Sequence, residues 1–358
     1  MHDDLAGPTV SIGRRGVLGA SLLVGATLTA PLLSRALAAD ALPLRRTQVE
    51  ANDVSLHVVE QGAGPAVLFC HGFPDTSATW RQQMQAVAAA GYRAIALDMR
   101  GYGLSDAPAD ANLYTSLQIT ADLVGVLDAL QVPSAVLVGH DWGATHVWQA
   151  ILKRPDRFRA AVGVSVPFSP RGDVSYYDSV RRQGFGDRYY AFASMKPEAD
   201  ALWAPAARTI SSNLYWSSAS PPASERWDPY DPAKNALRPA PVARPGWADA
   251  EYVDGTIRSF QRTGFHGGLN YYRAAQADFD LTAAWKGAVI WQPTLFVYGK
   301  GDKLTTSFGT FGAKLRQGLP GLVAEIGFDD CGHWVQHEAA DKLSAALIDF
   351  LRHIGLPR

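Results

Sequence analysis

Cysteine, methionine and excess charge are all scarce in this sequence. The 358 residues include two cysteines and four methionines, 19% of them are charged, and the formal net charge is -1. Because no stripe of Lys and Arg is present, nucleic acid and anionic membrane surfaces are poor partner candidates. The chain also lacks a Cys/His cluster with metal-ligand spacing, a P-loop and a Gly-rich dinucleotide fingerprint. We therefore expect neither a metal nor a bound cofactor.

Residues 1–38 have the composition of an export signal. Arg14 and Arg15 directly precede an apolar run that ends near Leu33, and Ala36-Leu37-Ala38 follows as a small-residue cleavage site. This order is typical of a secretory signal, and the paired arginines favour the twin-arginine pathway. An uncleaved membrane anchor is the alternative, but the apolar run is shorter than the ~20 residues that a span requires. We expect cleavage after Ala38 and a periplasmic or secreted protein without a membrane span.

From Thr47 onward, short β-branched runs alternate with helical stretches. Strands are predicted at 54–59, 66–69, 94–97, 135–138, 161–166, 294–298 and 322–326. Helices are predicted at 80–90, 116–130, 143–153 and 339–354. Such alternation is typical of an α/β fold in which a mostly parallel sheet carries helices on both faces.

The strand rhythm stops between Pro167 and about Ala284, where aromatic residues and prolines are frequent. We therefore expect a helical insertion, or cap, at 168–284 within one core formed by 39–167 and 285–358. A disordered linker is the alternative for the proline-rich part. Three tryptophans in and beside that part indicate that it packs: Trp216, Trp227 and Trp247.

Gly139-His140-Asp141-Trp142-Gly143 lies between a predicted strand and a predicted helix. This is the setting of the nucleophile elbow, G-x-S-x-G, with Asp in place of Ser. A helix-capping Asp is the alternative interpretation. If Asp141 is the nucleophile, it needs no base, because a carboxylate is already ionised at neutral pH. Its attack on a saturated carbon with a leaving group gives a stable alkyl ester, which favours epoxides and alkyl halides as substrates.

Hydrolysis of that ester requires a base that activates water. His333, in Cys331-Gly332-His333-Trp334, follows the predicted strand at 322–326, and Asp302 follows the strand at 294–298. The chain order Asp141, Asp302, His333 matches the order nucleophile, acid, histidine of the α/β-hydrolase fold. We assign His333 as the base and Asp302 as the group that orients its imidazole.

The ester's tetrahedral intermediate needs hydrogen-bond donors near the Asp141 carboxyl group. His71-Gly72-Phe73-Pro74 directly follows the strand at 66–69. The backbone N–H groups of Phe73 and Trp142 are the expected oxyanion hole. For His71 we expect a structural role in holding this loop.

These motifs resemble the soluble epoxide hydrolase family. The resemblance extends to Asp98-Met99-Arg100-Gly101-Tyr102-Gly103-Leu104-Ser105-Asp106 and to the Leu-Asn-aromatic-Tyr-Arg motif at 269–273. It implies a small apolar epoxide and water as the reactants, and two cap tyrosines that protonate the epoxide oxygen. The motif places one of them at Tyr272. Spacing favours Tyr189 over Tyr190 for the other, although Ala193-Ser194 departs from the family pattern there.

Two other functions and one structural question stay open at this point. A haloalkane or haloacetate dehalogenase would use the same Asp-His-Asp triad, but Phe73 has no side-chain donor for the halide. A non-catalytic, ligand-binding relative of the fold ranks third, because all catalytic positions are filled. Cys70 and Cys331 flank the two active-site loops, and we expect buried free thiols rather than a disulfide.

Overall fold

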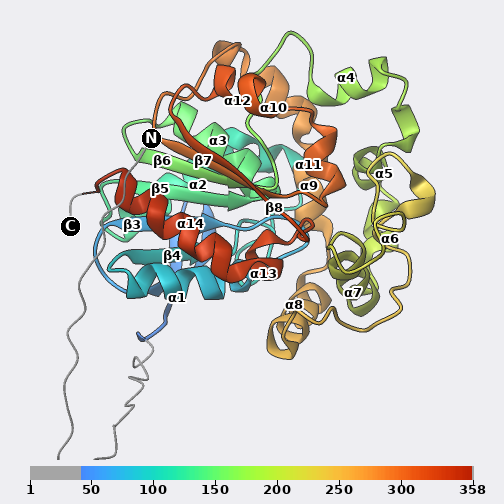
Figure 1. The fold of residues 1–358 in the computed structure, drawn as a ribbon, viewed down its shortest axis with the longest axis horizontal. Coiled ribbons are helices and arrows are strands. Elements are labelled where there is room, and N and C mark those ends of the chain that lie inside the picture. Colours follow the sequence, from blue (N-terminus) through green and yellow to red (C-terminus); the bar gives the residue numbers. More distant parts are fainter. Residues whose placement is uncertain (1–41, 357–358) are drawn as a thin grey trace, which may run out of the picture. The chain divides into compact units, whose positions relative to one another are not determined.

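The computed structural model describes residues 42–356 (Figure 1). The predicted signal peptide at 1–38 lies outside the described residues. Within residues 42–356, no helix is both long and apolar enough to cross a membrane.

An eight-stranded sheet forms the centre of this region, in the order β1-β2-β4-β3-β5-β6-β7-β8. Strand β2 runs antiparallel to both of its neighbours, and the other pairs are parallel. The predicted α/β class with a mostly parallel sheet is confirmed. The strands are β1 (Arg45–Ala51), β2 (Val54–Gln61), β3 (Ala66–Cys70), β4 (Arg93–Leu97), β5 (Ala135–His140), β6 (Phe158–Val164), β7 (Thr294–Gly299) and β8 (Leu322–Phe328).

Helices cover both faces of the sheet (Figure 1). Side chains of β3 alternate between the faces, because successive residues of a strand point in opposite directions. The core helices are α1 (Arg81–Ala89), α2 (Ser116–Ala129), α3 (Trp142–Lys153), α11 (Lys303–Ser307), α12 (Gly312–Gly318), α13 (Val335–Glu338) and α14 (Ala340–His353). Val67 and Phe69 pack in the cluster that includes α1 and α14, whereas Leu68 and Cys70 pack in the cluster that includes α2 and α3.

Between β6 and β7 the chain is helical, and we refer to residues 168–284 as the cap segment. Figure 1 shows several of its helices beside one end of the sheet. They are α4 (Tyr176–Arg182), α5 (Tyr190–Met195), α6 (Ala199–Trp203), α7 (Ala206–Trp216), α8 (Ala250–Thr263), α9 (His266–Arg273) and α10 (Ala275–Leu281). Short 3-10 turns are η1 (Ser77–Trp80), η2 (Ala111–Tyr114), η3 (Gly186–Arg188), η4 (Pro232–Lys234) and η5 (Ala283–Trp285).

The proline-rich part of the cap segment contains little regular structure but is held by its tryptophans. The indole N–H of Trp216 donates to the carbonyl oxygen of Arg238 at 2.9 Å, and that of Trp247 donates to Ser220 at 3.2 Å. Trp227 is buried. The stretch therefore packs, as its tryptophan content predicted.

Candidate active site

Asp141 occupies a tight turn between β5 and α3. Its φ of 53° and ψ of -119° lie outside the ordinary region for a residue with a side chain, which stores strain at this position. A Cβ added to Gly139 would lie 2.3 Å from the carbonyl oxygen of Gly143, and one added to Gly143 would lie 2.2 Å from that of Cys70. Only glycine fits at these two positions, so the turn holds Asp141 at the carboxyl edge of the sheet.

The two oxygens of the Asp141 carboxylate have different surroundings. Oδ1 accepts the backbone N–H of Phe73 at 2.9 Å, and the backbone N–H of Trp142 lowers the pKa of this carboxyl group. Oδ2 faces His333 instead. Burial raises the pKa of Asp141, and the neighbouring His333 and these two N–H groups oppose that effect. The expected oxyanion-hole donors therefore lie at the carboxylate.

His333 lies between two carboxylates. Its Nδ1 is 2.8 Å from Oδ2 of Asp302, and its Nε2 is 3.7 Å from Oδ2 of Asp141. Although burial lowers the pKa of His333, Asp302 and Asp141 outweigh that effect and raise it. The separation from Asp141 exceeds a direct hydrogen bond, so Nε2 is placed to act on a water beside that carboxylate.

Asp302 is itself fixed by local hydrogen bonds. As the N-cap of α11, it accepts the backbone N–H of Leu304 at 2.9 Å through Oδ1. Its Oδ2 also accepts the hydroxyl of Thr305 at 2.7 Å. A carboxylate held in this way keeps the His333 proton on Nδ1, which leaves Nε2 free as a base. The structure thus brings Asp141, Asp302 and His333 together as their chain order predicted.

His71 holds the loop that carries Phe73. Its Nε2 accepts the backbone N–H of Met99 at 3.0 Å, and its Nδ1 lies 2.8 Å from the carbonyl oxygen of Gly72. The ring is buried, and burial lowers its pKa. These contacts support the structural role expected for His71. Cys70 and Cys331 are both free and buried.

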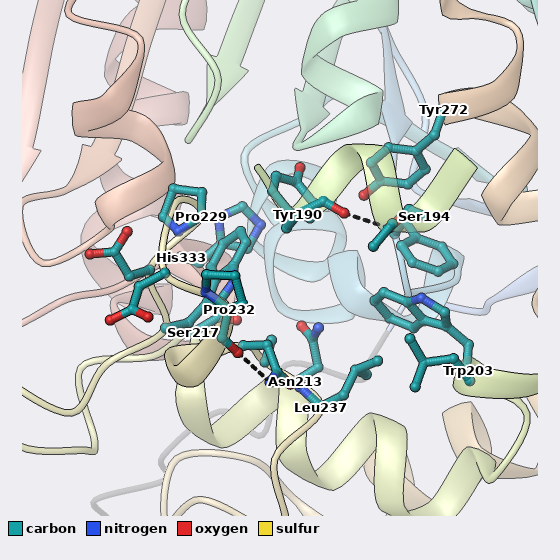
Figure 2. Close-up of a pocket in the computed structure, with 18 of the residues that line it drawn as sticks. Tyr190, Ser194, Trp203, Asn213, Ser217, Pro229, Pro232, Leu237, Tyr272 and His333 are labelled. Carbon is teal, nitrogen blue, oxygen red and sulfur yellow. Dashed lines mark hydrogen bonds between the residues drawn. The ribbon is translucent and has the colours of Figure 1, made fainter. Parts of the chain in front are cut away.

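The structure favours Tyr190 over Tyr189 as the partner of Tyr272. Tyr272 of α9 lines a cavity together with Asp141 and His333, and the second tyrosine on that cavity is Tyr190 rather than Tyr189. The rings of Tyr190 and Tyr272 lie 5.9 Å apart (Figure 2). The ring of Tyr189 instead packs against Tyr176 and Tyr230 and lines a second cavity that also reaches Asp141.

Spacing in the sequence favours Tyr189, but the directions of the Tyr189 and Tyr190 side chains depend on where α5 begins. Tyr189 is the N-cap of α5 and Tyr190 is its first residue. Successive side chains on a helix point about 100° apart, so the two rings take different directions.

The environment of Tyr272 keeps its phenol protonated. Burial and the Asp141 carboxylate raise the pKa of Tyr272, while Trp142 and Tyr190 partly oppose them. Tyr272 therefore keeps its proton and can donate it.

Two cavities reach the nucleophile. The first, of about 260 Å³, is lined by Phe73, Trp203, Tyr272 and His333 among others, and Figure 2 shows several of its side chains. The second, of about 510 Å³, extends along α3 toward Phe168. Asp141 and Tyr190 line both. Asp141 and Tyr190 therefore lie where the two cavities share part of their lining.

Comparisons with known proteins agree with this geometry. Residues 65–340 match the alpha/beta hydrolase fold family. The chain is 56% identical over 311 residues to an epoxide hydrolase of Caballeronia sordidicola, covering 87% of this chain and 94% of that protein. It is 38% identical over 318 residues to Epoxide hydrolase A of Mycobacterium tuberculosis, covering 86% of this chain and 97% of that protein.

A solved structure gives the same result. The crystal structure of Epoxide Hydrolase A from Mycobacterium thermoresistibile superposes with a TM-score of 0.79 at 38% identity, covering 87% of this chain and 98% of that chain. Together with the carboxylate at the nucleophile elbow, these similarities show that the chain belongs to the epoxide hydrolase family of the α/β-hydrolase fold.

Proposed function

We propose that this enzyme converts an epoxide and water to a vicinal diol through an alkyl ester on Asp141. The observation that carries the proposal is a carboxylate, rather than a hydroxyl, at the nucleophile elbow, with two tyrosines that line the same cavity. No cofactor takes part in these steps. The residues divide between two half-reactions, opening of the epoxide and hydrolysis of the ester.

In the first half-reaction, Oδ2 of Asp141 attacks one carbon of the epoxide. Oδ2 is the nucleophile because Oδ1 is engaged by the N–H of Phe73. The bond between that carbon and the epoxide oxygen breaks, and the oxygen takes a proton from Tyr272 or Tyr190. The alkoxide is a strong base, so a phenol can protonate it readily. The products are an alkyl ester and a free hydroxyl group.

In the second half-reaction, His333 removes a proton from a water that attacks the carboxyl carbon of the ester. The negative charge develops on Oδ1, which already accepts the N–H of Phe73, and the N–H of Trp142 acts on the same carboxyl group. Donors that are in place before the reaction stabilise such a charge most effectively. The bond between that carbon and Oδ2 then breaks, His333 returns the proton to Oδ2, and the diol leaves with this oxygen.

The other two functions receive less support. Phe73 offers a backbone N–H but no side-chain donor for a halide, and the relatives named above are epoxide hydrolases. A non-catalytic binding protein would not need the hydrogen bonds that orient His333.

A substrate panel tests the function directly. We expect the enzyme to form diols from apolar epoxides and to release little halide from alkyl halides of matched size. Rapid halide release with no diol from any epoxide would favour a dehalogenase, and no turnover of either class would favour a binding protein.

We also infer that residues 1–38 are removed on export and that 168–284 form a cap inserted in the core. The arginine pair and the Ala36-Leu37-Ala38 motif support export. Strand β1 begins at Arg45, so cleavage after Ala38 leaves every described element intact. Intact-mass measurement of periplasmic protein should give a chain that begins near Ala39. Recovery only from cytoplasm, with Met1 retained, would contradict export.

A further inference from the structure

The loop that carries His333 is held by one buried carboxylate. The backbone N–H of Gly332 donates to Oε2 of Glu338 at 3.0 Å, and that of Trp334 donates to Oε1 at 3.0 Å. The two oxygens therefore bind the residues on either side of His333. Hydrogen bonds to an ionised group are stronger than those between neutral groups, so this contact fixes the backbone of the loop.

The same carboxylate also reaches the cap segment. Oε2 of Glu338 accepts the backbone N–H of Ala219 at 2.7 Å. Two residues earlier, the carbonyl oxygen of Ser217 accepts the backbone N–H of His333 at 2.9 Å. Glu338 thus joins the base loop of the core to the segment that follows α7.

The charge of Glu338 also acts on His333. Burial raises the pKa of Glu338, and the opposing groups are the backbone N–H groups described above. Asp302 and Asp141 are the charged groups that face the His333 imidazole, and Glu338 lies on the backbone side of His333. All three carboxylates raise the pKa of His333. The His140 ring, 4.6 Å away, stays neutral because burial lowers its pKa.

We infer that Glu338 is a positioning residue for the second half-reaction: it holds Nε2 of His333 toward the Asp141 ester and links this geometry to the cap segment. The inference rests on the proposed function. Opening of the epoxide uses Asp141 and the tyrosines but no base. Loss of the Glu338 contacts should therefore slow hydrolysis of the ester much more than its formation.

The test compares Glu338→Gln with a matched control. Glu325→Gln removes a carboxylate that also accepts a backbone N–H, that of Gly312, but lies on β8 away from the site. In single-turnover experiments, Glu338→Gln should leave epoxide opening nearly unchanged and slow hydrolysis by about 10-fold or more, the range for a lost charged hydrogen bond. The ester should accumulate in intact-mass spectra of this variant, and Glu325→Gln should match the wild type in both steps.

Charge and geometry can be separated by a second variant and a second measurement. NMR titration of the His333 imidazole should give a lower pKa in Glu338→Gln, because a negative charge is removed, and no change in Glu325→Gln. Glu338→Asp keeps the charge on a shorter side chain, so it should retain more of the His333 pKa while hydrolysis stays slow. Thermal unfolding identifies any variant that fails to fold.

An unchanged ratio of the two rates together with an unchanged His333 titration would overturn the inference. Failure of the wild type to form an ester on Asp141 would overturn the proposed function instead. In that event the titration still decides whether Glu338 acts on His333, because it requires no turnover.

Discussion

The sheet and the cap segment supply the site in different ways. Asp141, Asp302 and His333 each follow the carboxyl end of a strand, as does the Phe73 N–H. Neighbouring parallel strands bring those ends to one edge, so the sheet topology places these groups. Tyr190 and Tyr272 come from α5 and α9, whose relative position depends on packing within the cap segment. Sheet topology thus determines the positions of the groups that form and hydrolyse the ester. Tertiary packing determines the positions of the two tyrosines that donate protons.

The largest effect is expected in the sheet, from His333→Gln. Opening of the epoxide needs no base, so the ester should form and then persist. Steady-state turnover should fall by at least about 10³-fold, as for other catalytic histidines, and intact mass should rise by the mass of one substrate. An active His333→Gln variant with no added mass would contradict the division of roles between Asp141 and His333.

In the cap segment, the three tyrosines give the sharpest test of the choice of Tyr190. Tyr272→Phe and Tyr190→Phe should each slow epoxide opening by about 10-fold or more, in line with the loss of a general acid. Tyr189→Phe should have a smaller effect, because Tyr189 lines only the second cavity, whereas Tyr190 and Tyr272 line the first cavity with His333. Rapid-quench measurement of ester formation distinguishes the three. If Tyr189→Phe were the slow variant and Tyr190→Phe normal, the original spacing argument would be correct.

The pH dependence of ester hydrolysis should reflect the carboxylates around His333. His333 acts as a base only when neutral, so hydrolysis should be slow at low pH and rise as the imidazole loses its proton. In the ester, Asp141 carries no charge, which leaves Asp302 as the main group that raises the His333 pKa. Asp302→Asn should therefore move this rise to lower pH and reduce its plateau. Single-turnover hydrolysis at a series of pH values measures both, and a midpoint that stays in place would show that Asp302 does not set it.

The sequence predicted much of the sheet and little of the cap. The strands at 66–69 and 135–138 were recovered as β3 and β5 because buried parallel strands are continuous apolar runs. Strand β1 was not predicted, because its first four residues are exposed and most of its residues are polar. Within the cap segment, the sequence indicated helices and packed tryptophans but no helix boundaries, so it could not show that Tyr190, and not Tyr189, lies beside Tyr272.

The smallest effect is expected on the free energy of unfolding, from a side-chain contact within the cap segment. Arg238 lies over the ring of Trp216, 3.9 Å from its centroid. Arg238→Ala removes this contact and two hydrogen bonds, to the carbonyl oxygens of Asn235 and Glu225, and should lower the free energy of unfolding by about 1 kcal/mol. Arg352→Ala removes an exposed pair with Asp349 on α14 and should change it by close to zero. Chemical denaturation compares the two, and equal losses would show that the Arg238 contact adds nothing to the cap.

The most direct test of the covalent route through Asp141 is a single turnover in oxygen-18 water with enzyme in excess. The first diol should carry no solvent oxygen, because its new hydroxyl comes from Oδ2 of Asp141, and the label should appear in the Asp141 carboxylate. Mass spectrometry of the diol and of the peptide that contains Asp141 reads both. A first-turnover diol that contains oxygen-18, with an unlabelled Asp141, would show direct attack of water on the epoxide and contradict the ester intermediate.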